Sequence, residues 1–511
     1  MKESIIKSIS RLTNGRNRIF CFLLAALTLF QTACNKALDV QSIHSSPENL
    51  TWKSITDARS GLFGIYGLLR AAMAQEDGYW IYGDLRMGDF TSYDRQDLDA
   101  IIHNELTGTY PVLNDLENWQ RFYAVVNAAA VFIEHAPQVV QNDPLYSQAN
   151  LEEDIAQARA LRALAYFYMV RIWGDVPLIT QAYDNGSFPA QARAKQSDVL
   201  NFAQQELLAA IPDLPYLYGI SPQTYYNQTS SYWNGTLINK ISAYAVLAHI
   251  SAWQSRYSDV DVYTSFITTN AASADVDTTT VDNLTNATTG LFATKSGSQI
   301  IAFNFMDALG ESSIDGHIED LTLASPFISR ANPHIYVPKD SINTIFTDSS
   351  DLRSGYDTTA HLYRTSYFTN YSSTIPLFSK IKVVRTGDYQ LYGSAIIFSR
   401  LEDIILLRAE ALAVLNRKED AMAALNMVRS ERDVPLYTDK TTEDIIDAIF
   451  NERRRELMGE GWRWYDQIRY NKIKQNNPVF SQLISSGGIY WPVSQDVITD
   501  NPLVTQNTYW K

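Results

Sequence analysis

The sequence contains very little cysteine. Its 511 residues include only two, Cys21 and Cys34. Cys21 lies in an apolar run, Ile19–Phe30, that follows a basic N-terminal stretch. This run is shorter than the ~20 apolar residues that a membrane-spanning helix needs, and a basic stretch before a short apolar run is typical of a secretory signal. We therefore expect residues 1–33 to be removed as a signal peptide, which leaves the mature chain without a pair of cysteines for a disulfide.

Cys34 is the candidate for a lipid anchor. It follows Thr32 and Ala33, as the acylated cysteine of a bacterial lipoprotein signal follows small residues, although Gln31 stands where that pattern usually has Leu. The alternative is an ordinary signal that is cut nearby and leaves Cys34 as a free thiol. A lone thiol is unfavourable in an oxidising compartment, so we favour acylation of Cys34, with the polar residues 34–50 as a tether.

Positive charge is also scarce. The net charge is −14, and loss of residues 1–33, which carry five basic residues and one acidic residue, changes it to −18. No basic stripe is present to neutralise phosphates, so nucleic acid is excluded as a partner. Beyond Ile19–Phe30 no apolar run reaches the length of a membrane span, so we expect the body of the protein to be soluble.

Motifs of known catalytic and metal sites are missing. The sequence has no His-Glu-x-x-His zinc motif, no Gly-x-Ser-x-Gly nucleophile elbow and no phosphate-binding loop, and its seven His residues are scattered. The acidic stretch Asp275–Asp282 lacks the central Gly and the closing Glu of a calcium loop, so we interpret it as a solvated turn. We therefore predict no catalytic residue, no metal and no cofactor.

Three glutamates fall on one face of a predicted helix at steps of four: Glu452, Glu456 and Glu460. Arg453–Arg455 interleave with them, so a structural network of ion pairs is favoured over a catalytic role. A glycosidase pair elsewhere in the chain stays open, because such a pair needs only two carboxylates at the right separation.

Helical periodicity dominates what the sequence does contain. Apolar residues repeat at spacings of three and four in Ile55–Met73, Asn118–Ala136, Leu151–Trp173, Ser197–Ile211, Thr236–Trp253, Arg400–Leu415, Glu419–Arg432 and Thr442–Ile468. Alanines recur in Arg400–Leu415 and Glu419–Arg432, and Asn416 between them tolerates the left-handed conformation that ends a helix. These features are typical of tetratricopeptide-like helical hairpins, so we predict a mainly α fold.

The segment Arg162–Ile179, RALAYFYMVRIWGDVPLI, is dense in aromatic, aliphatic and basic residues. Its small and aromatic residues alternate at helical spacing, so Ala165 and Ile172 are expected on a buried face. Gly174 ends the helix in a left-handed turn, and Pro177 prevents the helix from resuming. We interpret this segment as part of the frame and not of a ligand site.

Long irregular stretches lie between the helices, at residues 74–116, 216–234, 254–299 and 304–395. Aromatics make up 12% of the chain, and many of the 30 Tyr residues fall in these stretches. Tyr and Trp combine an apolar face with a polar edge, which suits core packing and also the binding of polar rings. Long loops in a compact domain are often functional, so we expect the ligand site there.

Several motifs in order along the chain resemble the SusD/RagB family of nutrient-binding outer-membrane lipoproteins of Bacteroidota. They are the Cys34 signal with LDV soon after it, WQRFYAVVN (119–127), ARALRALAYFYMVRIWGDVPLI (158–179), DLR (351–353), RLEDIILLRAEAL (400–412), ALNMVRSER (424–432), ERRRELMGEGWRWYDQIRY (452–470) and NPLVTQNTYW (501–510). The resemblance implies one SusD-like domain at 51–511, with an N-terminal part at about 51–250 and a C-terminal RagB/SusD part at about 251–511. It further implies four tetratricopeptide-like hairpins and a loop-rich, irregular half that holds the ligand.

The resemblance also implies a function. The protein would be lipid-anchored in the cell outer membrane, facing the exterior, and would bind oligosaccharide or polysaccharide nutrients without catalysis. It would deliver them to a SusC-like TonB-dependent transporter. We keep three alternatives, namely a peptide-binding RagB-like uptake protein, an α-helical glycoside hydrolase and a tetratricopeptide scaffold that binds only protein.

Ligand-contacting residues sit in variable loops of this family, so the candidates come from physical chemistry. A sugar ring shows apolar C–H faces edged by hydroxyls, so its site needs aromatics beside Asp, Asn or Arg. The loops that best meet this need supply Trp80, Tyr82, Asp89, Tyr93, Arg95, Asn304, Phe305 and Tyr336. Local packing of the loop is the alternative for each aromatic.

Overall fold

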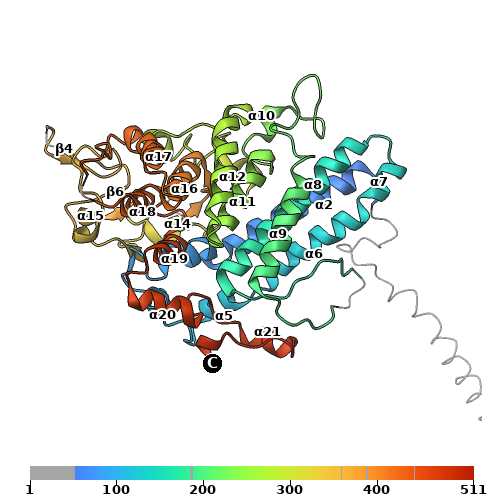
Figure 1. Cartoon of the computed structure of the whole chain (residues 1–511), viewed down its shortest axis with the longest axis horizontal. Helices are drawn as coiled ribbons and strands as arrows, with labels where there is room; N and C mark the ends of the chain where they lie inside the picture. The colour runs from blue at the N-terminus through green and yellow to red at the C-terminus, as the bar shows by residue number, and fades with distance from the viewer. Residues whose placement is uncertain (1–51, 185–187, 358, 387–388, 442) are drawn as a thin grey trace, which may run out of the picture. The chain divides into compact units, whose positions relative to one another are not determined.

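A computed structural model of the protein describes residues 52–184, 188–357, 359–386, 389–441 and 443–511. The predicted signal peptide (1–33), Cys34 and the tether (34–50) lie outside the described residues. Ser54–Lys511 form one compact unit, and helices dominate it (Figure 1).

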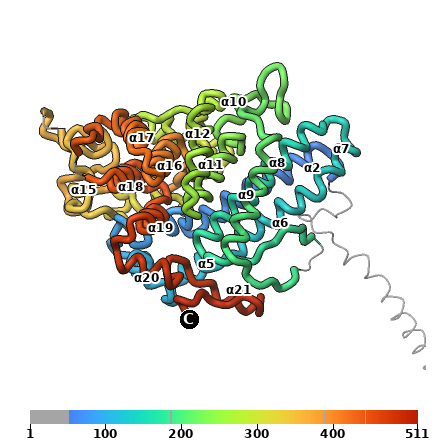
Figure 2. Tube along the Cα trace, viewed as in Figure 1, coloured from blue at the N-terminus to red at the C-terminus, as the bar shows by residue number. Residues whose placement is uncertain are grey.

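Long helices packed in pairs form the body of this unit. The pairs are α2 (Ile55–Ala74) with α6 (Gln120–His135), α8 (Gln148–Trp173) with α9 (Gln196–Ala210), α11 (Lys240–Trp253) with α12 (Tyr257–Asn270), and α16 (Leu401–Val414) with α17 (Lys418–Glu431). Each pair contacts the next, through α6 and α8, α9 and α11, and α12 and α16. Figure 2 shows the series running from the blue α2 through the green α11 and α12 to the orange α16 and α17. The predicted mainly α fold with tetratricopeptide-like hairpins is confirmed.

The remaining elements are short. The helices are η2 (Gln75–Asp77), α3 (Gly78–Trp80), η3 (Ile81–Leu85), α4 (Gln96–Ile102), α5 (Pro111–Glu117), α7 (Pro137–Asn142), α10 (Ser230–Trp233), η4 (Ala271–Ala274), α13 (Val281–Thr285), η5 (Asp307–Leu309), α14 (Ile318–Thr322), α15 (Lys339–Ile345), α18 (Ile445–Glu456), α19 (Arg463–Lys474), α20 (Pro478–Ser486), α21 (Gln495–Asp500) and η6 (Thr508–Trp510). The antiparallel strand pairs are β1 (Thr91–Ser92) with β3 (Ile335–Tyr336), β2 (Gln299–Phe303) with β10 (Ile396–Arg400), β4 (Tyr356–Asp357) with β5 (Leu362–Tyr363), β6 (Phe368–Thr369) with β7 (Leu377–Phe378), and β8 (Val384–Thr386) with β9 (Leu391–Tyr392).

Helix α8 confirms that Arg162–Ile179 belongs to the frame. Every residue from Ala160 to Trp173 is buried, so the helix is enclosed on all sides and not along one stripe. Gly174 ends the helix with a φ of 75°, a value that favours glycine. The Asp175 carboxylate accepts the backbone N–H of Gln196 at 2.8 Å and so braces the corner.

Helix α12 corrects the expectation that residues 254–299 are irregular. Tyr257, Val260 and Ile267 recur at helical spacing on its buried face, where Tyr257 and Val260 join residues of α11 and α16 in one apolar cluster. The helix is rich in Thr, Val, Ser and Asp, whose helix propensities are low. Packing between α11 and α16 therefore stabilises a helix that local propensity does not predict.

The single helix expected over Thr442–Ile468 is also wrong. Helix α18 ends at Glu456, and α19 begins at Arg463. Gly459 and Gly461 in the intervening turn have φ values of 76° and 77°, which non-glycine residues rarely adopt. Glu460 therefore lies in the turn and not on the helical face that carries Glu452 and Glu456.

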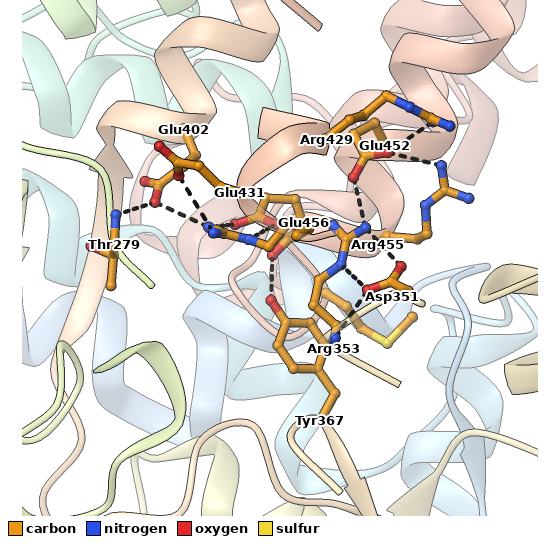
Figure 3. Close-up of polar contacts among 12 residues, drawn as sticks. Thr279, Asp351, Arg353, Tyr367, Glu402, Arg429, Glu431, Glu452, Arg455 and Glu456 are labelled. Carbon is orange, nitrogen blue, oxygen red and sulfur yellow. Dashed lines mark hydrogen bonds and ion pairs between the residues drawn. The ribbon is translucent and has the colours of Figure 1, made fainter. Parts of the chain in front are cut away.

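The three glutamates form buried ion pairs, as predicted, but with different partners from those expected. Figure 3 shows two of them, Glu452 and Glu456, near Arg353 and Arg455. Glu456 contacts Arg353, Arg400 and Arg432 at 2.7–3.0 Å. Burial alone would raise the pKa of Glu456, but Arg432 and Arg400 outweigh it and hold that pKa well below its usual value. Among Arg453–Arg455, only Arg455 pairs with one of the three, at 2.9 Å from Glu452. The partners of Glu456 are distant in sequence, so helical spacing does not reveal them.

Candidate functional site

A cleft of about 320 Å³ is the candidate ligand site. It is lined by one face of α2, by α10 and by the segment that follows β2, and we call it the aromatic cleft. Its main lining residues are Arg59, Phe63, Tyr66, Arg70, Tyr232, Trp233, Lys295, Phe303, Asn304, Met306, Leu309 and Glu311.

Helix α2 builds one wall of the aromatic cleft. Arg59, Phe63, Tyr66 and Arg70 follow one another at intervals of four, three and four residues, which places them on one face of a helix. The opposite face is buried and consists of Ala58, Leu62, Ile65, Leu69, Ala72 and Met73. Ser54 fixes the start of the helix by a capping box, in which its hydroxyl accepts the N–H of Asp57 and the Asp57 carboxylate accepts the N–H of Ser54.

Aromatic side chains from α2 and α10 meet in the cleft. The ring of Trp233 lies 5.6 Å from that of Phe63, at an angle of 32°. Trp233 is 4% exposed and donates its indole N–H to the carbonyl of Tyr225 at 2.9 Å, so its position is fixed from behind. Tyr232 packs edge-on against Trp233 at 4.7 Å and is 45% exposed. Tyr232 therefore presents the most accessible aromatic surface of the group.

A buried carboxylate braces this wall from the inside. Asp154 on α8 accepts hydrogen bonds from the hydroxyls of Tyr146, Tyr225 and Tyr226. Burial raises the pKa of Asp154 to about 6, against the opposing effect of these hydroxyl donors. The ring of Tyr226 lies 6.1 Å from Phe63, so the hydrogen-bonded loop around Asp154 supports the lining of the cleft.

The segment after β2 forms the polar side. Arg70 donates to the carbonyl of Asn304 at 2.7 Å and to the carboxylate of Glu311 at 2.7 Å. Its guanidinium also lies 4.8 Å from the ring centre of Phe305. Burial favours a raised pKa for Glu311, but the hydrogen bonds from Arg70 and from the N–H of Met306 lower it. Asn304 is fixed further by a 3.1 Å hydrogen bond to the carbonyl of Gly235.

The predicted site residues fall in three places. Asn304 lines the aromatic cleft, and Phe305 follows it with its ring beside the Arg70 guanidinium. Trp80 and Tyr82 are only 3% and 2% exposed, and Tyr82 donates its hydroxyl hydrogen to the carbonyl of Leu116 at 2.5 Å. Loop packing, the alternative for each aromatic, describes these two, and they leave almost no surface for a ligand.

The other four candidates lie around the β1–β3 pair. Tyr93 is 47% exposed, and its N–H donates to the carbonyl of His334 at 2.8 Å, next to Tyr336 in β3. Arg95 pairs with Asp97 at 2.6 Å. Asp89 is engaged by Arg454 and Arg463 at 2.5 and 3.2 Å, so its carboxylate is saturated. The structure thus brings Tyr93 and Tyr336 together, on elements that do not line the aromatic cleft.

Sequence reasoning missed most of the cleft. Arg59, Phe63, Tyr66 and Arg70 belong to a segment that was recognised only for its apolar face. The available signal was the regular spacing of large aromatic and basic residues on the other face of that amphipathic helix. Tyr232 and Trp233 lie in the stretch 216–234, which was noted as rich in Tyr but gave no candidate.

No group of three or more His, Cys, Asp or Glu side chains in the described ranges is placed to hold a metal ion. Of the helices in the described chain, none combines the length and the apolar character needed to cross a membrane.

Comparison with known proteins places the chain in a family. A sequence model of the SusD family matches residues 340–483. The crystal structure of a SusD superfamily protein from Bacteroides thetaiotaomicron is 50% identical in sequence, with a TM-score of 0.85, and the match covers 90% of this chain and 100% of that one. A curated SusD-like protein of Formosa agariphila is 25% identical over 96% of this chain and 99% of its own. The structure of Bacteroides fragilis NanU, 17% identical with a TM-score of 0.69 over 92% of this chain and 99% of that one, is similar in fold. Given a relative of 50% identity that matches over its whole length, this chain belongs to the SusD family.

Proposed function

We propose that the protein binds oligosaccharide or polysaccharide nutrients in the aromatic cleft and does not cleave them. The observation that carries this proposal is the exposed ring of Tyr232 beside the ring pair of Phe63 and Trp233, in an open cleft with a polar side formed by Arg70 and Asn304. Aromatic faces suit the C–H faces of a sugar, while the guanidinium and amide groups suit its hydroxyls.

The carboxylates of the cleft favour binding over hydrolysis. Glycoside hydrolysis generally uses two carboxyl groups on either side of the scissile bond, one of them an acid with a raised pKa. Among the described residues that line the aromatic cleft, Glu311 is the only carboxylate. Its pKa is lowered and it is paired with Arg70, so it is poorly suited to donate a proton.

Anchoring and delivery complete the proposed function. Family membership supports a lipoprotein that is held at the outer membrane by acylated Cys34, faces the exterior and hands its ligand to a SusC-like TonB-dependent transporter. In cells labelled with radioactive palmitate, we expect label on the wild-type protein and none on Cys34→Ala. Label that persists on Cys34→Ala would rule out this anchor.

Affinity electrophoresis through gels that contain single polysaccharides tests the binding itself, with peptides tested by calorimetry. We expect at least one polysaccharide to retard the full-length protein in detergent, and no shortened products after prolonged incubation. Product release would establish a hydrolase instead. Binding of peptides together with no retardation by any polysaccharide would favour the RagB-like peptide-binding alternative.

A further inference from the structure

The aromatic cleft carries a charge opposite to that of the chain as a whole. Its lining includes three cationic side chains, Arg59, Arg70 and Lys295, and one anionic side chain, Glu311. The whole chain has a net charge of −14. An excess of cations in one cleft of an acidic protein concentrates anions there and repels them elsewhere.

Arg70 and Glu311 neutralise one another. Their 2.7 Å ion pair and the hydrogen bond from Arg70 to the carbonyl of Asn304 use both terminal nitrogens of the guanidinium. This pair therefore holds the polar wall in place, and the excess positive charge comes from Arg59 and Lys295.

Arg59 lies against aromatic rings without an acidic partner. Its guanidinium is 5.6 Å from the ring centre of Phe63 and 5.8 Å from that of Tyr226. No carboxylate in the described part of the chain lies within ion-pair distance of it. The contact with the rings uses none of the N–H donors of Arg59, and guanidinium donors match a carboxylate or sulfate group in geometry.

Lys295 is a second cation without an acidic partner among the described residues. Its ammonium donates to the carbonyls of Ser231 and Tyr232 and lies 4.7 Å from the ring centre of Tyr232. Burial lowers the pKa of Lys295, so the charged form lacks full solvation. An anionic ligand would supply the missing counter-charge beside the most exposed aromatic ring of the cleft.

We propose that the aromatic cleft selects acidic glycans, in which uronic acid or sulfate groups are bound by Arg59 and Lys295 while sugar rings stack on Tyr232 and Phe63. This inference rests on the proposed glycan-binding function and narrows the class of ligand to anionic glycans. Neutral glycans would meet the same rings but would leave both cations without a counter-charge, so the cleft discriminates against them.

A matched pair of probes tests the proposal, namely oligogalacturonate and the same oligosaccharide after reduction of its carboxyl groups to alcohols, with chondroitin sulfate oligosaccharides as the sulfated probe. Calorimetry on the full-length protein in detergent should show binding of at least one acidic probe and at least tenfold weaker binding of the reduced probe. Arg59→Gln and Lys295→Gln should each weaken binding of the acidic probe by about tenfold or more, as expected for a lost hydrogen bond to a charged group. Arg59→Lys should weaken it less, because the charge remains.

Lys418→Gln is the control, because Lys418 is exposed and lies on α17 outside the cleft. In one outcome, the wild type binds neutral dextran or amylose but no acidic probe, and Tyr232→Ala loses this binding. That outcome would overturn the charge selectivity and leave the glycan-binding function intact. Acidic binding that is unchanged in both Arg59→Gln and Lys295→Gln would also overturn it. Failure of every acidic and neutral saccharide to bind would overturn the glycan-binding function together with the inference.

Discussion

Glu456 joins parts of the chain that are far apart in sequence. Its carboxylate pairs with Arg353, which precedes the β4–β5 hairpin and is drawn beside it in Figure 3. It also pairs with Arg400 at the end of β10 and with Arg432 just after α17. All four side chains are almost completely buried. A buried charge network of this kind adds specificity only while every member is paired.

Replacing Glu456 with Gln should therefore be strongly destabilising. The change leaves three buried guanidinium groups short of one negative charge, and breaking a buried ion pair costs about 3–5 kcal/mol. Urea unfolding at pH 7 measures the loss, with exposed Glu134→Gln on α6 as the control. Because the folded pKa of Glu456 is lowered, its contribution is present above the unfolded pKa and is lost as the pH falls through the folded pKa. A Glu456→Gln protein as stable as the control at pH 7 would contradict this account.

The contribution of Asp154 to stability is predicted to change with pH in the direction opposite to that of Glu456. The folded pKa of Asp154 is raised from 3.8 to about 6, so its contribution to stability is fully present below about pH 4 and is lost as the pH rises through about 6. Asp154→Asn removes this titration. Between pH 4 and pH 7, we expect the free energy of unfolding of the wild type to fall relative to that of Asp154→Asn by up to about 3 kcal/mol. Asp213→Asn, at an exposed position, should follow the wild type, and parallel curves for Asp154→Asn and the wild type would refute the prediction.

At the scale of elements, η3 and the turn after α18 depend on two glycines. A Cβ built on Gly83 would lie 1.9 Å from the carbonyl oxygen of Gly461, which is backbone and has little room to move. Gly83→Ala should cost about 3 kcal/mol or more, because the two segments must separate. Gly64 lies in α2 with open space around its Cβ position, so Gly64→Ala should be neutral or stabilise by about 0.5–1 kcal/mol. Equal thermal stabilities of the two variants would show that this backbone contact is unimportant.

The helices predicted from the sequence are those whose buried residues recur at regular spacing along the chain. α2, α6, α8 and α16 carry apolar residues at steps of three and four, and the pattern identifies each to within a few residues at either end. The apolar spacing did not predict α12, because its apolar residues are sparse and packing against neighbouring helices stabilises it. The break between α18 and α19 falls at Gly459 and Gly461, whose positive φ values end the helical path. The apolar spacing continues across these two glycines, so the pattern alone did not reveal the break.

The site was predicted only in part for a related reason. The composition of the loops drew attention to Asn304, which lines the candidate cleft, but it gave equal weight to Trp80 and Tyr82, which tertiary packing buries. Exposure of an aromatic ring is decided by which elements cover it, and local sequence does not contain that information. The cleft face of α2 was encoded in the spacing of Arg59, Phe63, Tyr66 and Arg70, yet only its pairing with α10 makes those residues a site.

At the scale of the whole molecule, the frame of paired helices is distinct from the aromatic cleft, where we propose that the ligand binds. α2 packs against α6 and α8, and the aromatic cleft opens where α2 and α10 meet the segment after β2. In the proposed function, a lipid anchor at Cys34 would hold the protein at the membrane surface, and a captured polymer would be passed on without chemistry. Membership of the SusD family is shown, whereas the place where this member holds its ligand is the central claim to be tested.

Three exposed tyrosines provide the most direct test of that claim. Tyr232 lies in the aromatic cleft, Tyr93 lies beside the β1–β3 pair, and Tyr389 lies between β8 and β9, outside the lining of the cleft. Their exposed fractions are 45%, 47% and 78%. The measurement is the affinity of the full-length protein for whichever saccharide it binds, by calorimetry, for the wild type and for each tyrosine-to-alanine variant. We predict that Tyr232→Ala weakens binding at least about tenfold, or about 1.4 kcal/mol, while Tyr93→Ala and Tyr389→Ala match the wild type. Unchanged affinity in Tyr232→Ala, or a loss confined to Tyr93→Ala, would contradict the account and place the ligand elsewhere.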